Sequence, residues 1–142
     1  RIRNELTGEW DKRGVKKGKE FAILTDEISR AWSGMTTRQY KKLKGLKKEN
    51  LRDNMSDLEL VLTMLAEAST RDISQTEKPH SFTESQEIAR RGGKVAGIAR
   101  QALEAETGKP VVTAQNATDF QRLFTDIVED AAALPEQKEK RI

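Results

Sequence analysis

The chain of 142 residues is long enough for one domain, and its composition is polar, with 35% apolar, 5% aromatic and 35% charged residues. Because a chain of this length buries roughly two thirds of its unfolded surface, we expect a thin core of Leu, Ile, Val and Ala. The absence of cysteine excludes disulfides and thiolate metal sites and fits a reducing cytoplasm. No run reaches the ~18 apolar residues of a membrane span, and no signal peptide is visible. We therefore expect a cytoplasmic protein, and the first residue, Arg1 rather than Met, predicts a fragment.

The net charge is only +3, but the charges are segregated along the chain. One basic cluster lies in residues 12–19, and a second lies in residues 38–52, where Glu49 is the single acid. The segment near the C-terminus is acidic in places. Both basic clusters belong to the N-terminal third, so an anionic partner is expected to meet that part of the chain.

The N-terminal third is predicted to contain three helices. Residues 1–11 place apolar side chains four apart, at Ile2, Leu6 and Trp10. Residues 20–32 fit a helix better than a strand followed by a helix, because the larger apolar side chains fall at helical spacing. This second helix is expected to end at Gly34. These apolar side chains are Phe21, Leu24, Ile28 and Trp32.

A third short helix is expected after Thr36 or Thr37, either of which can cap it, with Tyr40 and Leu43 pointing inward. It is expected to stop at Gly45.

The central helix is predicted from Ser56 to about Thr70. Ser56 and Glu59 form a capping box, in which each side chain binds the other's backbone N–H. The apolar residues that follow the cap cover a larger part of the helix surface than the single stripe of a surface helix. This helix is therefore expected to lie at the centre of the fold. These apolar residues are Leu58, Leu60, Val61, Leu62, Met64 and Leu65.

The rest of the chain predicts a linker and two or three further helices. Residues 74–82 are polar and contain Pro79, which is typical of a linker. A helix is expected from a cap at Thr83 to Gly108, and Gly92–Gly93 offers a point at which it could divide in two. An amphipathic helix is predicted over 118–134, followed by a flexible charged tail at 135–142. The chain is therefore predicted to be all-α, with five to seven helices in one domain over 1–134 and a possible subdivision near 74–82.

The residues give little support for catalysis, so a non-enzymatic protein without cofactor or metal is expected. His80 is the only histidine and follows Pro79 in the polar linker, where a solvated loop residue is the simpler interpretation. Asp53, Asp57 and Glu59 could gather near one helix start, but capping and interaction with the helix dipole explain them more simply than a metal site.

The glycine-rich stretch 92–97 has two interpretations. Glycines before a helix can expose backbone N–H groups to a phosphate, but the lysine and hydroxyl of a Walker motif are not in place. Close packing of a second helix, within the chain or in a homodimer, fits better, because small residues let helices approach each other. The residues of this small-residue face are Ala89, Gly93, Ala96, Gly97 and Ala99.

The second basic cluster is the main candidate for a functional surface. Lys and Arg at this density neutralise phosphates and can bind nucleic acid, but Tyr40 is the only aromatic residue nearby, so base stacking is not indicated. A solvated helix face without a partner explains these charges about equally well, and an acidic protein surface is a third candidate partner. The candidate contact residues are Arg38, Lys41, Lys42, Lys44, Lys47, Lys48 and Arg52.

Several stretches resemble the C-terminal half of the damage-inducible protein D family. Related phage and mobile-element proteins carry this half behind a BRO-type N-terminal domain and are often called antirepressors. The longest similar stretch is 45–55, continuing into 57–60 and 63–65. Three further stretches, 20–28, 91–100 and 107–113, extend the resemblance over roughly residues 13–113.

The resemblance implies a bacterial, cytoplasmic regulator of the SOS response or of phage genes, acting by binding a protein. The implied partner is the recombinase filament in the damage-inducible proteins and a repressor in the phage relatives, and neither role brings a catalytic site. The BRO-type domain is not part of this sequence, and the familiar ending gives way after Asn116 to the helix expected over 118–134. Direct DNA binding through residues 38–52 and oligomerisation of the full protein remain the alternatives.

Overall fold

The computed structural model describes residues 1–115 and 127–132, and it confirms the all-α expectation for these residues. Residues 127–132 are helical. No helix in the described part of the chain is long and apolar enough to cross a membrane. The elements of residues 1–115 are α1 (Ile2–Lys12), α2 (Lys19–Ser33), α3 (Thr37–Leu43), the 3-10 helix η1 (Arg52–Asn54), α4 (Asp57–Glu77) and α5 (Phe82–Thr107).

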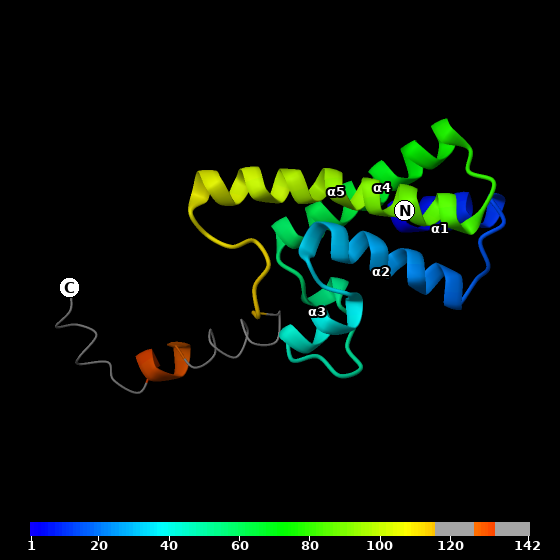
Figure 1. The fold of residues 1–142 in the computed structure, drawn as a ribbon. Helices are drawn as coiled ribbons and strands as arrows, with labels where there is room; N and C mark the ends of the chain where they lie inside the picture. The colour runs from blue at the N-terminus through cyan, green and yellow to red at the C-terminus, as the bar shows by residue number, and fades with distance from the viewer. Residues whose placement is uncertain (116–126, 133–142) are drawn as a thin grey trace.

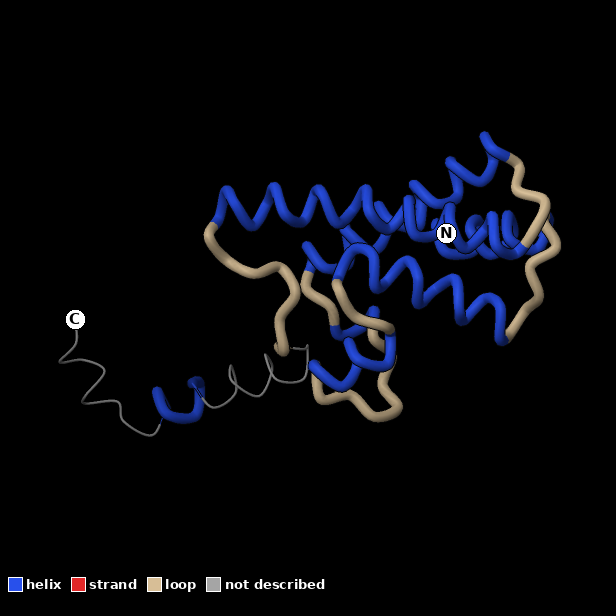
Figure 2. Tube along the Cα trace, in the orientation of Figure 1, coloured by secondary structure: helices blue, strands red, loops and turns tan. Residues whose placement is uncertain are grey.

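The long helix α5 organises the fold, because it packs along both α2 and α4 (Figure 1). Helix α1 packs on α4. The short α3 contacts α2 and lies below the other helices in the view of Figure 2. The core between these helices is formed mainly by apolar residues of α1, α2, α4 and α5. Its largest fully buried apolar side chains are Trp10, Tyr40, Leu6 and Leu24.

The predicted ends of the N-terminal helices agree with the structure. Helix α2 ends at Gly34, which adopts the left-handed conformation with φ of 82°. The cap of α3 is Thr36, whose hydroxyl accepts the backbone N–H of Gln39 while the Gln39 side chain accepts the N–H of Thr36. The capping box of Ser56 and Glu59 at the start of α4 is also present.

The prediction of a linker over 74–82 is wrong for its first half, because α4 continues to Glu77. The connection is only residues 78–81, and Lys78 ends α4 in the left-handed conformation. Helix α5 is capped by Ser81, whose hydroxyl accepts the backbone N–H of Glu84, and not by Thr83.

Helix α5 runs without a break through Gly92–Gly93, so the division allowed at this pair does not occur. Glycine inside a helix costs about 1 kcal/mol relative to alanine. Neighbouring helices explain its use here. A Cβ atom at Gly92 would lie 1.9 Å from the Thr70 hydroxyl oxygen, and one at Gly93 would lie 2.6 Å from the Ile28 carbonyl oxygen.

Two expectations about burial are wrong. Tyr40 points inward from α3 as predicted, but Leu43 is exposed. On α4, Leu62 is buried, whereas Leu58, Val61 and Leu65 are exposed, so α4 is covered on fewer sides than its composition suggests. Of the helix predicted over 118–134, only 127–132 lies within the described residues, and the tail 135–142 lies outside them.

Candidate anionic-partner surface

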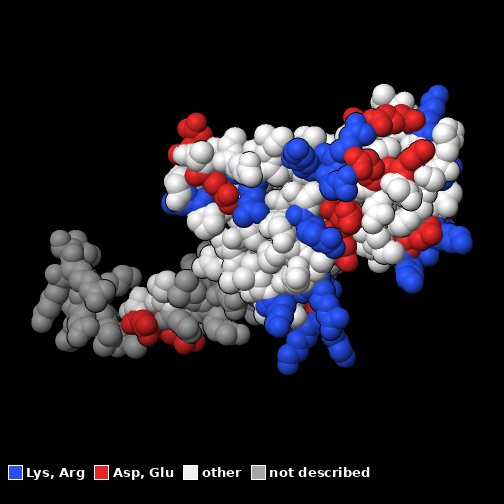
Figure 3. Space-filling model, in the orientation of Figure 1, with Lys and Arg blue, Asp and Glu red and all other residues white. Residues whose placement is uncertain are grey.

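Helix α3 and the loop after it present a group of basic side chains to solvent. Arg38, Lys42, Lys47 and Lys48 are exposed, and Lys41 is half-buried. Figure 3 shows Lys and Arg side chains projecting at the lower edge of the molecule, where Figure 1 places α3 and the loop that follows it. We call these five residues the basic surface.

The acid within this stretch is held against the backbone. The Glu49 carboxylate accepts the backbone N–H of Lys47 at 2.6 Å. Hydrogen bonds from backbone N–H groups lower the pKa of Glu49, so its side chain remains a carboxylate. These N–H groups partly neutralise the negative charge of the carboxylate. The five cations of the basic surface outnumber this one acid, so the surface carries a net positive charge.

Lys44 does not belong to the basic surface, which corrects its prediction as a contact residue. Its side chain is completely buried, and its Nζ lies 2.8 Å from Oε1 of Glu59. Nζ also donates to the backbone carbonyl oxygens of Thr113, at 2.9 Å, and Gln115. The Tyr40 hydroxyl donates to the other carboxylate oxygen of Glu59. Since Tyr40 precedes Lys44 by one helical turn, the inward position of Tyr40 was a local signal that Lys44 also points inward.

Burial and this contact change the acidity of Tyr40. Burial first, and then the hydrogen bond to Glu59 and the charge of that carboxylate, raise the pKa of the Tyr40 phenol far above its ordinary range. The phenol therefore stays a donor to Glu59. Together these contacts fix the C-terminal end of α3, the helix that carries Arg38, Lys41 and Lys42, to the N-terminal end of α4.

Arg52 is also less available than predicted, because it forms an ion pair with Glu67 on α4. The other oxygen of the Glu67 carboxylate lies 3.4 Å from Nη1 of Arg3 on α1. Arg3 donates a second hydrogen bond to the Thr25 hydroxyl at 2.7 Å. Burial lowers the pKa of Arg3, and the Glu67 carboxylate opposes this shift. Glu67 thus compensates charge at Arg3 and Arg52.

An open pocket of ≈ 630 Å³ lies beside the basic surface, between α1, α2 and α3. Arg3, Arg38 and Lys41 supply cations to its lining, and Asp26 supplies one acid, which accepts the backbone N–H of Thr37 at 3.1 Å. Arg38 and Lys41 offer cations that suit a phosphate or a carboxylate, beside Arg3, whose charge Glu67 compensates. Arg3 was not found from the sequence because it lies far from residues 38–52 and reaches the site only through the packing of α1.

The small-residue face of α5 packs within the chain. Ala89 and Ala96 are completely buried, Ala99 packs against the core, and Gly93 and Gly97 lie against the backbone of α2. Because α2 of the same chain occupies this face, its use as an oligomer face is wrong.

The described residues contain no group of three or more His, Cys, Asp or Glu side chains placed to hold a metal ion. His80 is exposed, and its backbone N–H donates to the Glu84 carboxylate at 2.7 Å. No protein-family model, curated protein or solved structure matches this chain. The resemblance to the damage-inducible protein D family therefore stays a prediction.

Proposed function

We propose that the chain is a non-enzymatic binding module that docks an anionic macromolecular partner on the basic surface. The observation that carries this proposal is the group of four exposed and one half-buried basic side chains on α3 and its following loop. The buried Lys44–Glu59 ion pair holds the end of α3 against α4. Charges presented on a rigid element steer a complementary partner and fix its orientation without ordering a flexible segment first.

An acidic surface on a protein is the partner we favour. The sequence resemblance adds the cellular setting, a cytoplasmic regulator of the DNA-damage response or of phage genes, whose partner is a recombinase filament or a repressor. The aromatic residue of this region, Tyr40, is buried and unable to stack on nucleic-acid bases. The surface therefore offers charge rather than base contacts.

Capture of partners from extracts of DNA-damaged bacterial cells tests this proposal. The variant Lys42→Glu/Lys47→Glu reverses two exposed charges of the basic surface, and we expect it to lose the partners that the unmodified chain retains. The matched control Lys12→Glu/Arg90→Glu changes the net charge equally at exposed positions on α1 and α5. We expect the control to retain them. An unchanged partner set with the first variant would rule out the basic surface as the docking site.

Direct binding of DNA is the second candidate, and the pocket lined by Arg3, Arg38 and Lys41 is the observation that favours it. A backbone phosphate carries the charge and oxygen atoms that such a pocket accepts. In that case affinity for duplex DNA falls steeply with salt, and the slope decreases by about one for each phosphate-contacting cation removed. A titration that shows no binding at low salt would exclude this candidate and leave the protein-binding proposal in place.

A further inference from the structure

Helices α4 and α5 together expose an apolar face that nothing in residues 1–115 covers. Between 37% and 58% of each of its five residues is accessible to solvent. Large apolar side chains exposed on two neighbouring helices are typical of a contact site. The apolar face consists of Leu58, Val61 and Leu65 on α4 and Val95 and Ile98 on α5.

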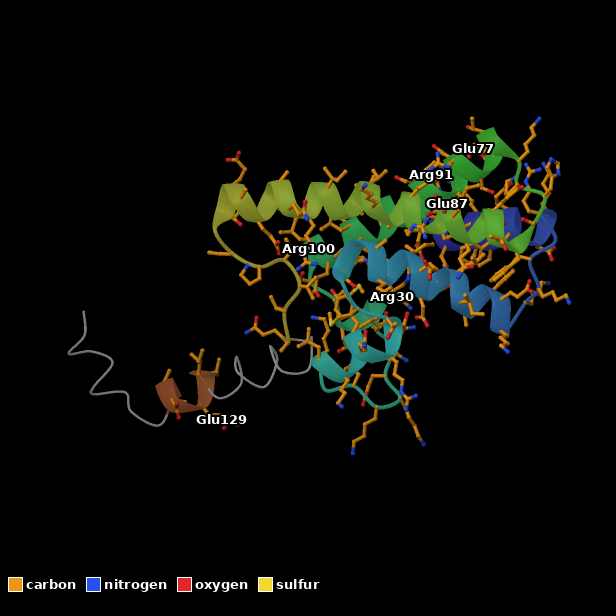
Figure 4. All side chains as sticks on the ribbon, in the orientation of Figure 1. Arg30, Glu77, Glu87, Arg91, Arg100 and Glu129 are labelled. Atoms are coloured by element: carbon orange, nitrogen blue, oxygen red, sulfur yellow. The ribbon has the colours of Figure 1, made fainter. Side chains whose placement is uncertain are left out.

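Helical spacing and two contacts place the α5 residues of the apolar face beside α4. Arg91, Val95 and Ile98 are spaced four and three apart and therefore share one stripe of α5. Arg91 donates to both carboxylate oxygens of Glu77 on α4, at 2.9 Å and 2.6 Å, as Figure 4 shows by the proximity of these two labelled residues. The stripe of Arg91 therefore borders α4.

The α4 residues of the apolar face lie on the side away from α1. Three side-chain hydrogen bonds join α1 to α4. Arg3 donates to Glu67, Arg71 donates to Glu5, and Ser74 donates to Glu9. The α4 and α5 helices run antiparallel with Thr70 opposite Gly92. Counting five residues from that contact along each helix sets Leu65 level with Gly97, between Val95 and Ile98.

A second uncovered apolar surface lies on the helical residues 127–132. Ile127 is 58% and Val128 is 50% exposed. The same helix carries the exposed acids Glu129 and Asp130. The apolar face is bordered on α5 by Arg91 and Lys94, which are both exposed. The two surfaces are therefore matched in apolar character. Arg91 is paired with Glu77, so Lys94 is the cation at this border that suits the acids Glu129 and Asp130.

The course of the chain brings these two surfaces within reach of each other. Lys44 holds the carbonyl oxygen of Gln115 and the carboxylate of Glu59, so Gln115 lies beside the residue that follows Leu58. Eleven residues, 116–126, then lead to Ile127. They span up to ~40 Å, whereas Leu58 and Leu65 are only ~10 Å apart along α4. Because the helix of residues 127–132 belongs to the same chain, its local concentration at the apolar face exceeds that of a second copy in dilute solution.

We propose that the helix of residues 127–132 packs on the apolar face of its own chain, with Ile127 and Val128 against Leu65, Val95 and Ile98. This contact covers both apolar surfaces and places Glu129 and Asp130 near Lys94. It lies on α4 and α5, apart from the basic surface, and it does not depend on the proposed function.

Cysteine cross-linking tests the contact directly, since the chain contains no cysteine. The full chain with Leu65→Cys/Val128→Cys should form an intramolecular disulfide on mild oxidation, seen as a monomer of increased mobility. The control, Lys42→Cys/Val128→Cys, uses an exposed position on α3. We expect the first pair to react at least about tenfold faster than the control. Equal rates would overturn the proposal. A disulfide-linked dimer in place of the monomer would also overturn it, because the helix on the apolar face would then belong to a second copy.

Binding of a fluorescent hydrophobic dye gives an independent measurement without cysteine. If residues 127–132 cover the apolar face, Ile127→Ser/Val128→Ser releases the helix and raises dye fluorescence. If the helix stays free, the same variant removes exposed apolar surface and lowers the fluorescence. The two outcomes have opposite signs, and unchanged or reduced fluorescence would contradict the contact. Both residues lie outside residues 1–115, so the substitutions leave the core formed by residues 1–115 unchanged.

Discussion

Lys44 and Glu59 form an ion pair of 2.8 Å between Nζ and Oε1, and both side chains are entirely excluded from solvent. A buried ion pair needs further hydrogen bonds to offset its desolvation. Here the Lys44 ammonium also donates to backbone carbonyls at Thr113 and Gln115, and the Glu59 carboxylate accepts from Tyr40 and from the backbone N–H of Ser56. The pair thus joins α3, α4 and the segment after α5.

Replacing Lys44 by methionine should strongly destabilise the fold, because it leaves the Glu59 carboxylate buried without its cation. Removing one partner of a buried pair typically costs about 3–5 kcal/mol. Urea denaturation followed by circular dichroism measures the change in the free energy of unfolding. The control Lys42→Met alters an exposed lysine two residues away and should change it by less than about 0.5 kcal/mol.

The double variant Lys44→Met/Glu59→Gln separates charge from packing in the same cluster. Glutamine keeps an acceptor for Tyr40 and for the helix cap but removes the unpaired charge, so stability should partly return. If Lys44→Met alone costs no more than Lys42→Met, the ion pair does not hold these elements together.

Tyr40 should not ionise while the protein is folded. It is the only tyrosine in the chain, so phenolate absorbance reports it alone. Burial, the hydrogen bond to Glu59 and the charge of Glu59 raise its pKa in the folded state, whereas the unfolded chain has the ordinary value of 10.0. The contribution of Tyr40 to stability is therefore complete below pH 10.0 and declines as the pH rises above it.

An alkaline titration monitored by phenolate absorbance and circular dichroism checks this expectation. Phenolate should appear only together with loss of helix, in one transition. The variant Tyr40→Phe should show a smaller decline in stability above pH 10.0 than the unmodified chain, because the contribution of Tyr40 is missing. Phenolate that appears near pH 10.0 with the helix content intact would show that the Tyr40 hydroxyl is accessible.

Features set by neighbouring residues could be predicted from the sequence. Gly34 ends α2, and Ser56 with Glu59 caps α4, because caps and left-handed helix ends depend on a few consecutive residues. The burial of Tyr40 followed from the same local spacing. The candidate site was less predictable. The spacing of Lys44 from Tyr40 indicates an inward position, but its partner, Glu59, lies on another helix, so Lys44 was mistaken for a surface residue.

Packing between distant elements explains the other errors. Residues 56–65 are apolar on more than one side of α4, and the sequence does not specify which side α5 and α1 cover. Leu58 and Leu65 are exposed for this reason. Arg52 was predicted to be a surface cation, but it forms an ion pair with Glu67, fifteen residues further along the chain. Arg3 of α1 contacts the same Glu67 carboxylate.

The cap of α5 offers a comparison between the predicted and the observed residue. Replacing Ser81 by alanine removes the hydroxyl that accepts the Glu84 backbone N–H, which should cost about 1 kcal/mol of stability. Thr83 lies inside the first turn of α5 and is exposed, so Thr83→Ala should change stability by less than about 0.5 kcal/mol. Thermal unfolding of both variants decides between the two caps, and a larger loss in Thr83→Ala would contradict the observed helix start.

Alanine at Gly93 and at Gly8 should change stability in opposite directions. Both glycines lie inside helices, where alanine is intrinsically favoured by about 1 kcal/mol. The environment of Gly8 contains no atom within 4 Å of an added Cβ, so Gly8→Ala should stabilise the protein. At Gly93 the added Cβ would lie 2.6 Å from the Ile28 carbonyl oxygen and 2.7 Å from the Ala31 Cβ. Helix α2 would have to move away, which should cost about 1–3 kcal/mol.

Urea denaturation of the two single variants measures this difference, and the sign of the change carries the result. Helix propensity alone predicts stabilisation in both variants. Only direct contact between the backbones of α2 and α5 predicts a loss at Gly93, since the methyl group has no flexible side chain to displace there. Stabilisation by Gly93→Ala would therefore show that α2 and α5 are further apart than the structure places them. A loss would show that glycine at this position is required for the close packing that positions α2, and with it α3 and the basic surface.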